Sequence, residues 1–222
     1  MRHFDIEIND LQNRLINMAK LVQLMIKIAS KEFIKKDSQQ INIILSIENE
    51  INIQEIIIDN KCLKLIALNQ PVGTDLRLIT SVIKINSDLE RMADEAVNIS
   101  KMAYDLPNFL QLKFLFINIL KMIDDVQNMI MDCIKAFNTN NSQLALLVLK
   151  KDNKVDFLRD RIVDDIKSLM IKFTNIDIIQ KALDLIFIAK SIERIGDHAT
   201  NISEDIVFML HGKDVRHPQR RI

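Results

Sequence analysis

Acidic residues four positions apart recur in this sequence at places where they could share a metal ion. Glu90 and Asp94 lie in a Glu-Arg-x-x-Asp-x-x-x-Asn pattern, and the same pattern returns with Glu193 and Asp197. Residues four apart on a helix lie only about 40° apart around its axis, so each pair presents two carboxylates to one side. Carboxylate oxygens are the ligands that Mg²⁺, Mn²⁺, Ca²⁺ and iron prefer. Both pairs are therefore candidate metal ligands.

A second set of polar residues lies on the predicted helices that precede these pairs. Glu48 and Asn52 share a helical stripe with isoleucines, and Asp152 and Asp156 share one with valine and leucine. An unpaired carboxylate withdrawn from water costs several kcal/mol, so acids on an apolar stripe must be paired, protonated or bound to a cation. Glu90 with Asp94, and Glu193 with Asp197, also align with apolar residues of their own helices. We therefore expect the acids of both sets to face the seams between helices. The predicted metal ligands are Glu48, Asn52, Glu90 and Asp94 in the first half and Asp152, Asp156, Glu193 and Asp197 in the second.

The acidic pairs could also exist without a metal. Acids four apart on a helix are common and mostly solvated, and the adjacent Arg91 or Arg194 could neutralise a carboxylate. The recurrence of the pairs in register, each opposite a second acidic helix, favours a metal. Zinc usually takes Cys or His ligands, and none lies in line with the acids, so a hard cation fits better.

Long helices must carry these residues, because little in the sequence would interrupt one. Only three Gly and three Pro occur in 222 residues, and these two residue types are the strongest helix breakers. Apolar residues recur with alternating spacings of three and four, as in a bundle helix. Breaks at 35–38, 71–73, 105–107, 138–142 and 174–175 divide the chain into six predicted helices. The predicted fold class is all-α.

The second half of the chain repeats the first. The pattern at 90–98 reappears at 193–201, with the same order of helices and loops around it. Chance similarity between two helical sequences would preserve apolar spacing, but it would not preserve Glu-Arg-x-x-Asp-x-x-x-Asn. Internal duplication accounts better for the similarity. Residues 1–106 and 107–222 are therefore predicted to form two tandem three-helix bundles.

The charge balance argues against nucleic acid as a partner. The 30 basic and 30 acidic residues cancel, so no overall field attracts phosphate backbones. Acids stand near the N-terminus where a signal peptide is apolar, and no stretch reaches about 18 consecutive apolar residues. Cys62 and Cys133 lie outside any metal or redox spacing and are predicted to be core residues. We expect a cytoplasmic protein without a membrane span.

Several stretches closely resemble the PhoU family of phosphate-transport regulators. They are residues 65–77 (LIALNQPVGTDLR), 88–94 (DLERMAD) and 192–199 (IERIGDHA), and residues 212–217 are similar to the ending of the family. The resemblance covers nearly the whole chain. It implies two tandem three-helix bundles whose E/D-x-x-x-D motifs hold iron, zinc or other metal ions in some members. This sequence departs from the motif at Asn52, which offers a neutral carbonyl oxygen in place of a carboxylate.

The resemblance also implies a function and partners. Members of the family are negative regulators of phosphate uptake and of the phosphate-starvation regulon. They connect the phosphate ABC transporter, through its ATPase subunit, to a phosphate-sensing histidine kinase, usually as homodimers.

In the repeat register of this sequence, Glu55 and Asp59 correspond to Arg159 and Val163. The first-half site is therefore expected to hold metal differently from the second, or not at all.

Two other functions compete with that of a non-enzymatic adaptor. A carboxylate-bridged di-metal oxidase on a helical bundle would carry a Glu-x-x-His motif on two helices, and the sequence contains none. It also lacks a phosphate-binding glycine loop and a Ser/His/Asp arrangement, so we predict no catalytic residue. A purely structural helical bundle would instead pair its acids with Arg91 and Arg194.

Overall fold

The protein is all-helical in the residues that its structure describes. These are residues 3–33, 38–106, 113–171 and 175–215 of a computed structural model. The six helices are α1 (His3–Glu32), α2 (Ser38–Asn69), α3 (Thr74–Asp105), α4 (Lys113–Thr139), α5 (Ser142–Met170) and α6 (Ile176–His211). No strand occurs within these ranges. The prediction of an all-α fold with six long helices is confirmed.

Polar caps and left-handed residues end the helices near the predicted breaks. The side chain of Asn141 accepts a hydrogen bond from the Leu144 backbone N–H (3.0 Å) at the start of α5. Asn175 does the same for the Asp177 N–H (2.8 Å) at the start of α6. Gly212 ends α6 with φ 66°, a conformation that glycine adopts without steric cost. Loop chemistry therefore fixes where the helices of the second half begin and end.

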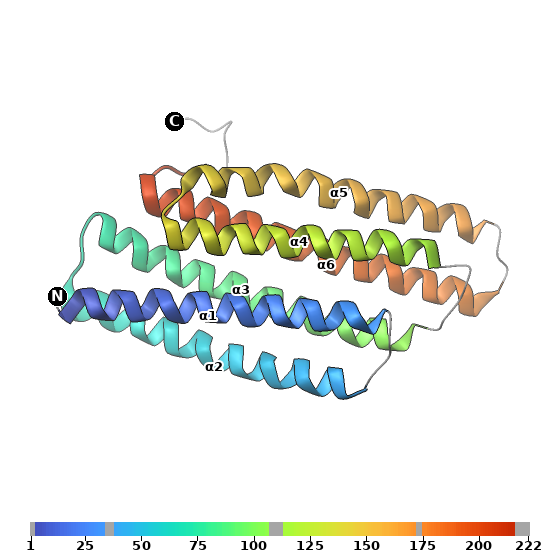
Figure 1. Cartoon of the computed structure of the whole chain (residues 1–222), viewed down its shortest axis with the longest axis horizontal. Coiled ribbons are helices and arrows are strands. Elements are labelled where there is room, and N and C mark those ends of the chain that lie inside the picture. Colours follow the sequence, from blue (N-terminus) through green and yellow to red (C-terminus); the bar gives the residue numbers. More distant parts are fainter. Residues whose placement is uncertain (1–2, 34–37, 107–112, 172–174, 216–222) are drawn as a thin grey trace.

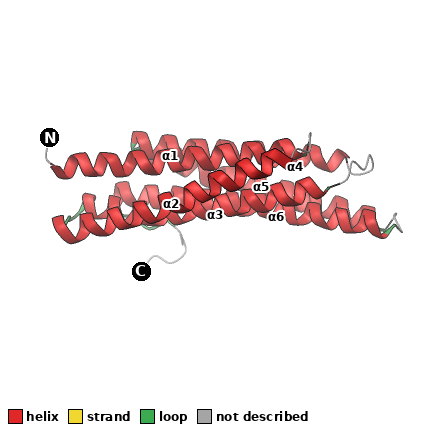
Figure 2. Cartoon of the chain, turned by 90° about the horizontal axis from the view of Figure 1, so that it is seen from below, coloured by secondary structure: helices red, strands yellow, loops and turns green. Residues whose placement is uncertain are grey.

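The helices form two three-helix units that lie side by side with parallel long axes. The unit of α1, α2 and α3 and the unit of α4, α5 and α6 are stacked one above the other in Figure 1. The most extensive contact between any two helices joins α3 to α6, which run antiparallel between the units. A view from below shows the same elongated bundle with both units along its length (Figure 2). The two predicted tandem bundles are therefore present, and they share a long interface.

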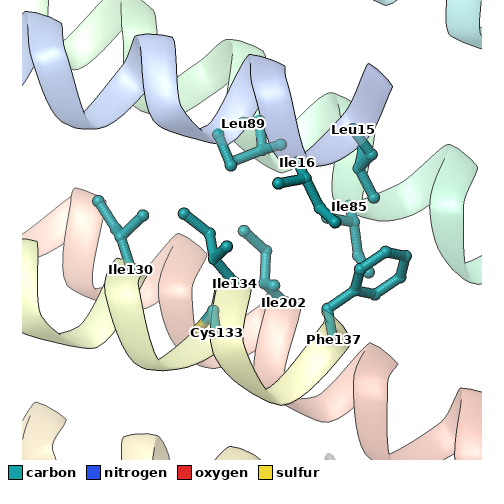
Figure 3. Close-up of a pocket in the computed structure, with 10 residues that line it drawn as sticks. Leu15, Ile16, Ile85, Leu89, Ile130, Cys133, Ile134, Phe137 and Ile202 are labelled. Atoms are coloured by element: carbon teal, nitrogen blue, oxygen red, sulfur yellow. The ribbon is translucent and has the colours of Figure 1, made fainter. Parts of the chain in front are cut away.

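One apolar core runs through both units. Leu15 and Leu89 of the first unit and Ile130, Phe137 and Ile202 of the second line a small apolar pocket at the interface (Figure 3). All five side chains are almost completely buried. Apolar burial is the dominant favourable contribution to folding, so each unit depends on the other for part of its stability.

Both cysteines are core residues, as the sequence predicts. Cys62 and Cys133 are free thiols with 0% and 2% of their surface exposed. Burial raises the pKa of each thiol to about 12, which leaves the reactive thiolate form scarce. Neither cysteine is therefore suited to redox or nucleophilic chemistry.

None of the helices in the described residues combines the length and the apolar character needed to cross a membrane.

Truncation of a leucine at the interface tests whether the two units unfold together. We expect Leu89→Ala to lower the free energy of unfolding by about 2–5 kcal/mol, because it opens a cavity in a close-packed core. Urea unfolding followed by circular dichroism should remain a single transition, shifted as a whole. Leu147→Ala is the matched control, since Leu147 is 50% exposed on α5 and its truncation should leave the transition almost unchanged. Two separate transitions, only one of them shifted by Leu89→Ala, would contradict a shared core.

Candidate metal centre

The predicted ligands lie along two equivalent helix pairs, α2 with α3 and α5 with α6. In the first half Glu48 and Asn52 are on α2 and Glu90 is on α3, and all three are half-buried. In the second half Asp152 and Asp156 on α5 and Glu193 on α6 are half-buried in the same way. Each pair of helices thus carries acids on both of its members along the line where the two helices meet, in the register of the internal repeat. This line of contact is called a groove below.

The expectation that every predicted ligand faces the apolar seam is wrong for Asp94 and Asp197. Both side chains are exposed. The reason is geometric, because each step of four residues rotates the position by about 40° around the axis. That step carries Asp94 past Glu90, and Asp197 past Glu193, toward solvent. The carboxylates therefore line the solvent-facing rim of the two grooves and do not lie deep in the core.

Electrostatic repulsion shows that the acids of the second half are near one another. Burial, followed by the negative charges of Asp156, Asp197 and Glu193, raises the pKa of Asp152 from its ordinary 3.8 to about 6. One oxygen of Asp152, Oδ1, is buried and has no hydrogen-bond partner among the described residues. The positive charge of Arg159 lowers this pKa, but by less than burial and the neighbouring acids raise it.

Gly196 on α6 allows the close approach of α5 at this cluster. A methyl group added at Gly196 would lie 3.0 Å from Oδ1 of Asp152 and 3.6 Å from Cγ1 of Val155. The first distance is shorter than almost all contacts that real side chains make. The corresponding residue of the first half is Ala93, which is completely buried. Gly196→Ala would therefore require the Asp152 side chain to move by a few tenths of an ångström, whereas the first half accommodates Ala93.

Arg159 is the positive group that sequence reasoning did not assign to the site. Its Nη1 lies 2.6 Å from Oε1 of Glu193, and its Nη2 lies 3.6 Å from Oδ1 of Asp156. Its Nε lies 2.8 Å from Asp160. The Arg159 side chain is only 23% exposed, so these ion pairs are partly shielded from water and stronger than surface pairs. The one available signal was the mismatch between Arg159 and Glu55 in the repeat register.

Arg91 and Arg194, the arginines that the sequence suggested as partners, do not fill this role. Arg194 donates from Nη1 to Oε1 of Glu95 (3.0 Å), which joins α6 to α3 across the two units. Arg91 is exposed and forms no ion pair within the described ranges. Arg91 and Arg194 therefore form no ion pair with the cluster acids among the described residues, and their charges only partly offset the raised pKa values of Glu90 and Asp197.

The first half holds acids and amide oxygens without an equivalent arginine. Burial raises the pKa of Glu90, and the charges of Asp94 and Glu55 raise it further. Burial likewise raises the pKa of Glu55, followed by the charges of Asp59 and Asp94. Asp94 is exposed as a residue, but neighbouring atoms remove part of the water around its carboxyl, and this loss, followed by the charge of Glu48, raises its pKa. Repulsion between neighbouring carboxylates thus contributes to all three effects.

Two buried amide oxygens lie in the same region. Asn52 donates from Nδ2 to Oε1 of Glu48 (3.2 Å), and Asn86 donates from Nδ2 to Oδ1 of Asp59 (2.9 Å). The Oδ1 atoms of Asn52 and Asn86 are buried and have no hydrogen-bond partner among the described residues. Carbonyl oxygens of this kind suit hard cations, so the donor set of the first half fits Mg²⁺, Mn²⁺ or Ca²⁺.

The side chains do not form a ready-made coordination shell. In the part of the chain that the structure describes, no three His, Cys, Asp or Glu side chains are grouped so that they could hold a metal ion as placed. Like charges repel without a cation between them. A bound metal would therefore have to draw the carboxylates together from both helices of a groove.

The sequence and the fold both match proteins of one family. The PhoU domain matches this chain twice, over residues 15–103 and 119–206. The phosphate-specific transport system accessory protein PhoU homolog of Pseudomonas putida is 32% identical over 216 residues, which are 97% of this chain and 84% of that protein. The homolog of Aquifex aeolicus is 34% identical over 211 residues, which are 95% of this chain and 94% of that protein.

Solved structures give the same result. The crystal structure of PhoU from Pseudomonas aeruginosa has a TM-score of 0.86 at 30% identity and covers 95% of this chain and 100% of its own. The phosphate transport system regulatory protein PhoU from Streptococcus pneumoniae has a TM-score of 0.87 at 27% identity, covering 96% of this chain and 99% of its own. The likeness extends over both three-helix units.

Removal of one repelled charge should stabilise the metal-free protein. Because folding raises the pKa of Asp152, the free energy of unfolding falls as the pH rises from about 4 to about 6. Asp152→Asn removes this loss. We expect its melting temperature in chelator at about pH 7.5 to rise by a few degrees, since about 1 kcal/mol corresponds to roughly 2–4 °C in a chain of this size.

The control is Asp124→Asn, because Asp124 is an exposed acid on α4. Its melting temperature should equal that of the wild type at both pH values, and Asp152→Asn should have little effect at about pH 4, where the carboxyl is protonated. A lower melting temperature for Asp152→Asn in chelator at about pH 7.5 would show that the charge is not repelled in the folded state.

Proposed function

Because this chain belongs to the PhoU family, we propose that it is a non-enzymatic regulator of phosphate transport. The observation that carries the proposal is the match to phosphate transport accessory proteins over almost the entire chain. Both three-helix units take part in that match. Function is thus inferred from whole-chain similarity, and the carboxylate clusters suggest how the regulator works.

The proposed action is negative regulation of phosphate uptake and of the phosphate-starvation regulon. The chain would act in the cytoplasm as an adaptor between the ATPase subunit of the phosphate ABC transporter and a phosphate-sensing histidine kinase. The word accessory in the names of its relatives supports a partner within the transport system. A long helical bundle offers extended faces that two different proteins could contact at once.

A homodimer is part of the proposal. The outer side of α2 exposes several large apolar residues, among them Ile53, Ile56 and Leu63. Exposed apolar groups gathered on one element favour association with another protein surface. Light scattering of the purified protein would establish whether two copies associate.

Metal ions are proposed to bind at the carboxylate clusters. The ligands would come from Glu48, Asn52, Glu90 and Asp94 in the first half and from Asp152, Asp156, Glu193 and Asp197 in the second. A hard divalent cation, Mg²⁺ or Mn²⁺, or iron or zinc as in some relatives, would supply the positive charge that the acids lack. When bound, it would tie α2 to α3 or α5 to α6 and so fix the angle between the helices. Partner surfaces on those helices would then depend on the metal.

A melting experiment tests the metal proposal. We expect Mn²⁺ to raise the melting temperature of the wild type, by an amount equivalent to about 2.7 kcal/mol at a hundredfold excess over the dissociation constant. Glu90→Gln/Asp94→Asn should lose most of this increase. The control, Glu50→Gln/Asp124→Asn, removes the same charge at two exposed positions outside the clusters and should keep the increase. Equal curves with Mn²⁺ and with chelator for every protein would refute the metal proposal.

A binding assay tests the adaptor proposal separately. The immobilised chain should capture the transporter ATPase subunit and the cytoplasmic part of the histidine kinase. Capture should fall in chelator and in Glu90→Gln/Asp94→Asn, because without the metal α2 and α3 would no longer be tied together and the partner surface would lose its shape. Failure to capture either partner with metal present would refute the adaptor role. Oxygen consumption by metal-loaded protein would favour the di-metal oxidase instead.

A further inference from the structure

We propose that Arg159 is a built-in cation that takes the place of a metal ion in the second half, so that the chain binds one divalent cation, in the groove between α2 and α3. The inference rests on the proposed metal binding and specifies where it occurs. It reverses the expectation that the first half, with Asn52 in its motif, is the weaker site. The support comes from a comparison of equivalent positions in the two grooves.

Arg159 already bridges the acids that a metal ion in the second groove would have to bridge. Its guanidinium contacts Glu193 on α6 at 2.6 Å and Asp156 on α5 at 3.6 Å. Two of the four predicted second-half ligands are therefore engaged by a fixed positive charge. A divalent cation entering this groove would be repelled by the guanidinium and would compete with it for the same oxygens.

The first half has an acid where the second half has this arginine. Glu55 corresponds to Arg159 in the repeat register, and it is half-buried beside Asp59 and Asp94. Glu48, Glu55, Glu90 and Asp94 therefore influence one another electrostatically across α2 and α3, and none of the four forms an ion pair with an arginine within the described ranges. Arg91 is near this groove, but its counterpart Arg194 is near the other, so neither distinguishes the two halves.

Neutral oxygen ligands add to the difference between the grooves. Asn86 is completely buried, and its Oδ1 has no hydrogen-bond partner within the described ranges. Its amide nitrogen donates to the Glu55 carbonyl oxygen (3.0 Å) and to Asp59 (2.9 Å), which places the side chain beside Glu55. The corresponding residue of the second half is Ala189, which has no oxygen to offer. Carboxylates together with amide carbonyls form the mixed oxygen set that Mn²⁺, Mg²⁺ and Ca²⁺ accept.

Exchange of the two residues provides the test. The number of Mn²⁺ ions per chain would be measured by native mass spectrometry and by electron paramagnetic resonance titration. We expect one ion in the wild type, two in Arg159→Glu, and none in Glu55→Arg. The second site created in Arg159→Glu should bind Mn²⁺ at least about tenfold more tightly than the same groove does in the wild type.

Matched controls separate the local effect from the change in net charge. Arg161→Glu makes the same charge change at an exposed position of α5 and should leave one ion per chain, and Glu50→Arg should do so on α2. Glu55→Gln removes the carboxylate without adding a cation, and it serves if Glu55→Arg does not fold. Circular dichroism of each protein verifies the helical fold.

The outcomes distinguish the inference from the proposal on which it rests. Two ions in the wild type, with no change in Arg159→Glu, would overturn the role of Arg159 and leave metal binding intact. One ion that is retained in Glu55→Arg or Glu55→Gln and lost in Glu193→Gln would also overturn it, by placing the metal in the second half. No ion in any variant would overturn metal binding itself.

Discussion

The packing of α3 against α6 sets the positions of the other helices. Each of these two helices contacts its counterpart along one side and the other two helices of its own unit along two further sides. Only the remaining part of its surface faces water. Small and apolar residues such as Ala93 and Ile195 fill the inner side and are completely buried. The acids that lie at the contact of α3 with α6 have positive or imidazole partners on the opposite helix, as Glu95 has Arg194 and Asp88 has His198. Glu90 and Glu193 lie instead where α3 meets α2 and α6 meets α5, and there burial and neighbouring acids raise their pKa values.

Much of this arrangement could be predicted from the sequence. The scarcity of Gly and Pro and the three-four apolar spacing are properties of the local chain, so six helices and their approximate ends followed directly. The repeat was visible because it preserved a polar pattern as well as an apolar one. The PhoU match over 15–103 and 119–206 agrees with that division. The burial of Cys62 and Cys133 was predicted because both lie outside any metal or redox spacing.

The environment of the acids could be predicted only in part. A helical projection correctly places Glu90 and Glu193 beside an adjoining helix. It does not show how wide the buried face of the helix is, so it cannot tell whether a residue at the edge of that face is buried or exposed. Asp94 and Asp197 proved to be exposed for that reason. The contact of Arg159 with Glu193 depends on the spacing between two helices and on a long flexible side chain, and periodicity contains no information about either.

Gly196 shows how far the two halves have become specialised since the duplication. It differs from its counterpart Ala93 by one methyl group, and that methyl would press on the Asp152 oxygen at 3.0 Å. A segment of the first repeat placed in the second would bring an alanine against this carboxylate, and the Asp152 side chain would have to move by a few tenths of an ångström. One carbon atom thus sets a different helix spacing in each repeat, although the order of helices is the same in both.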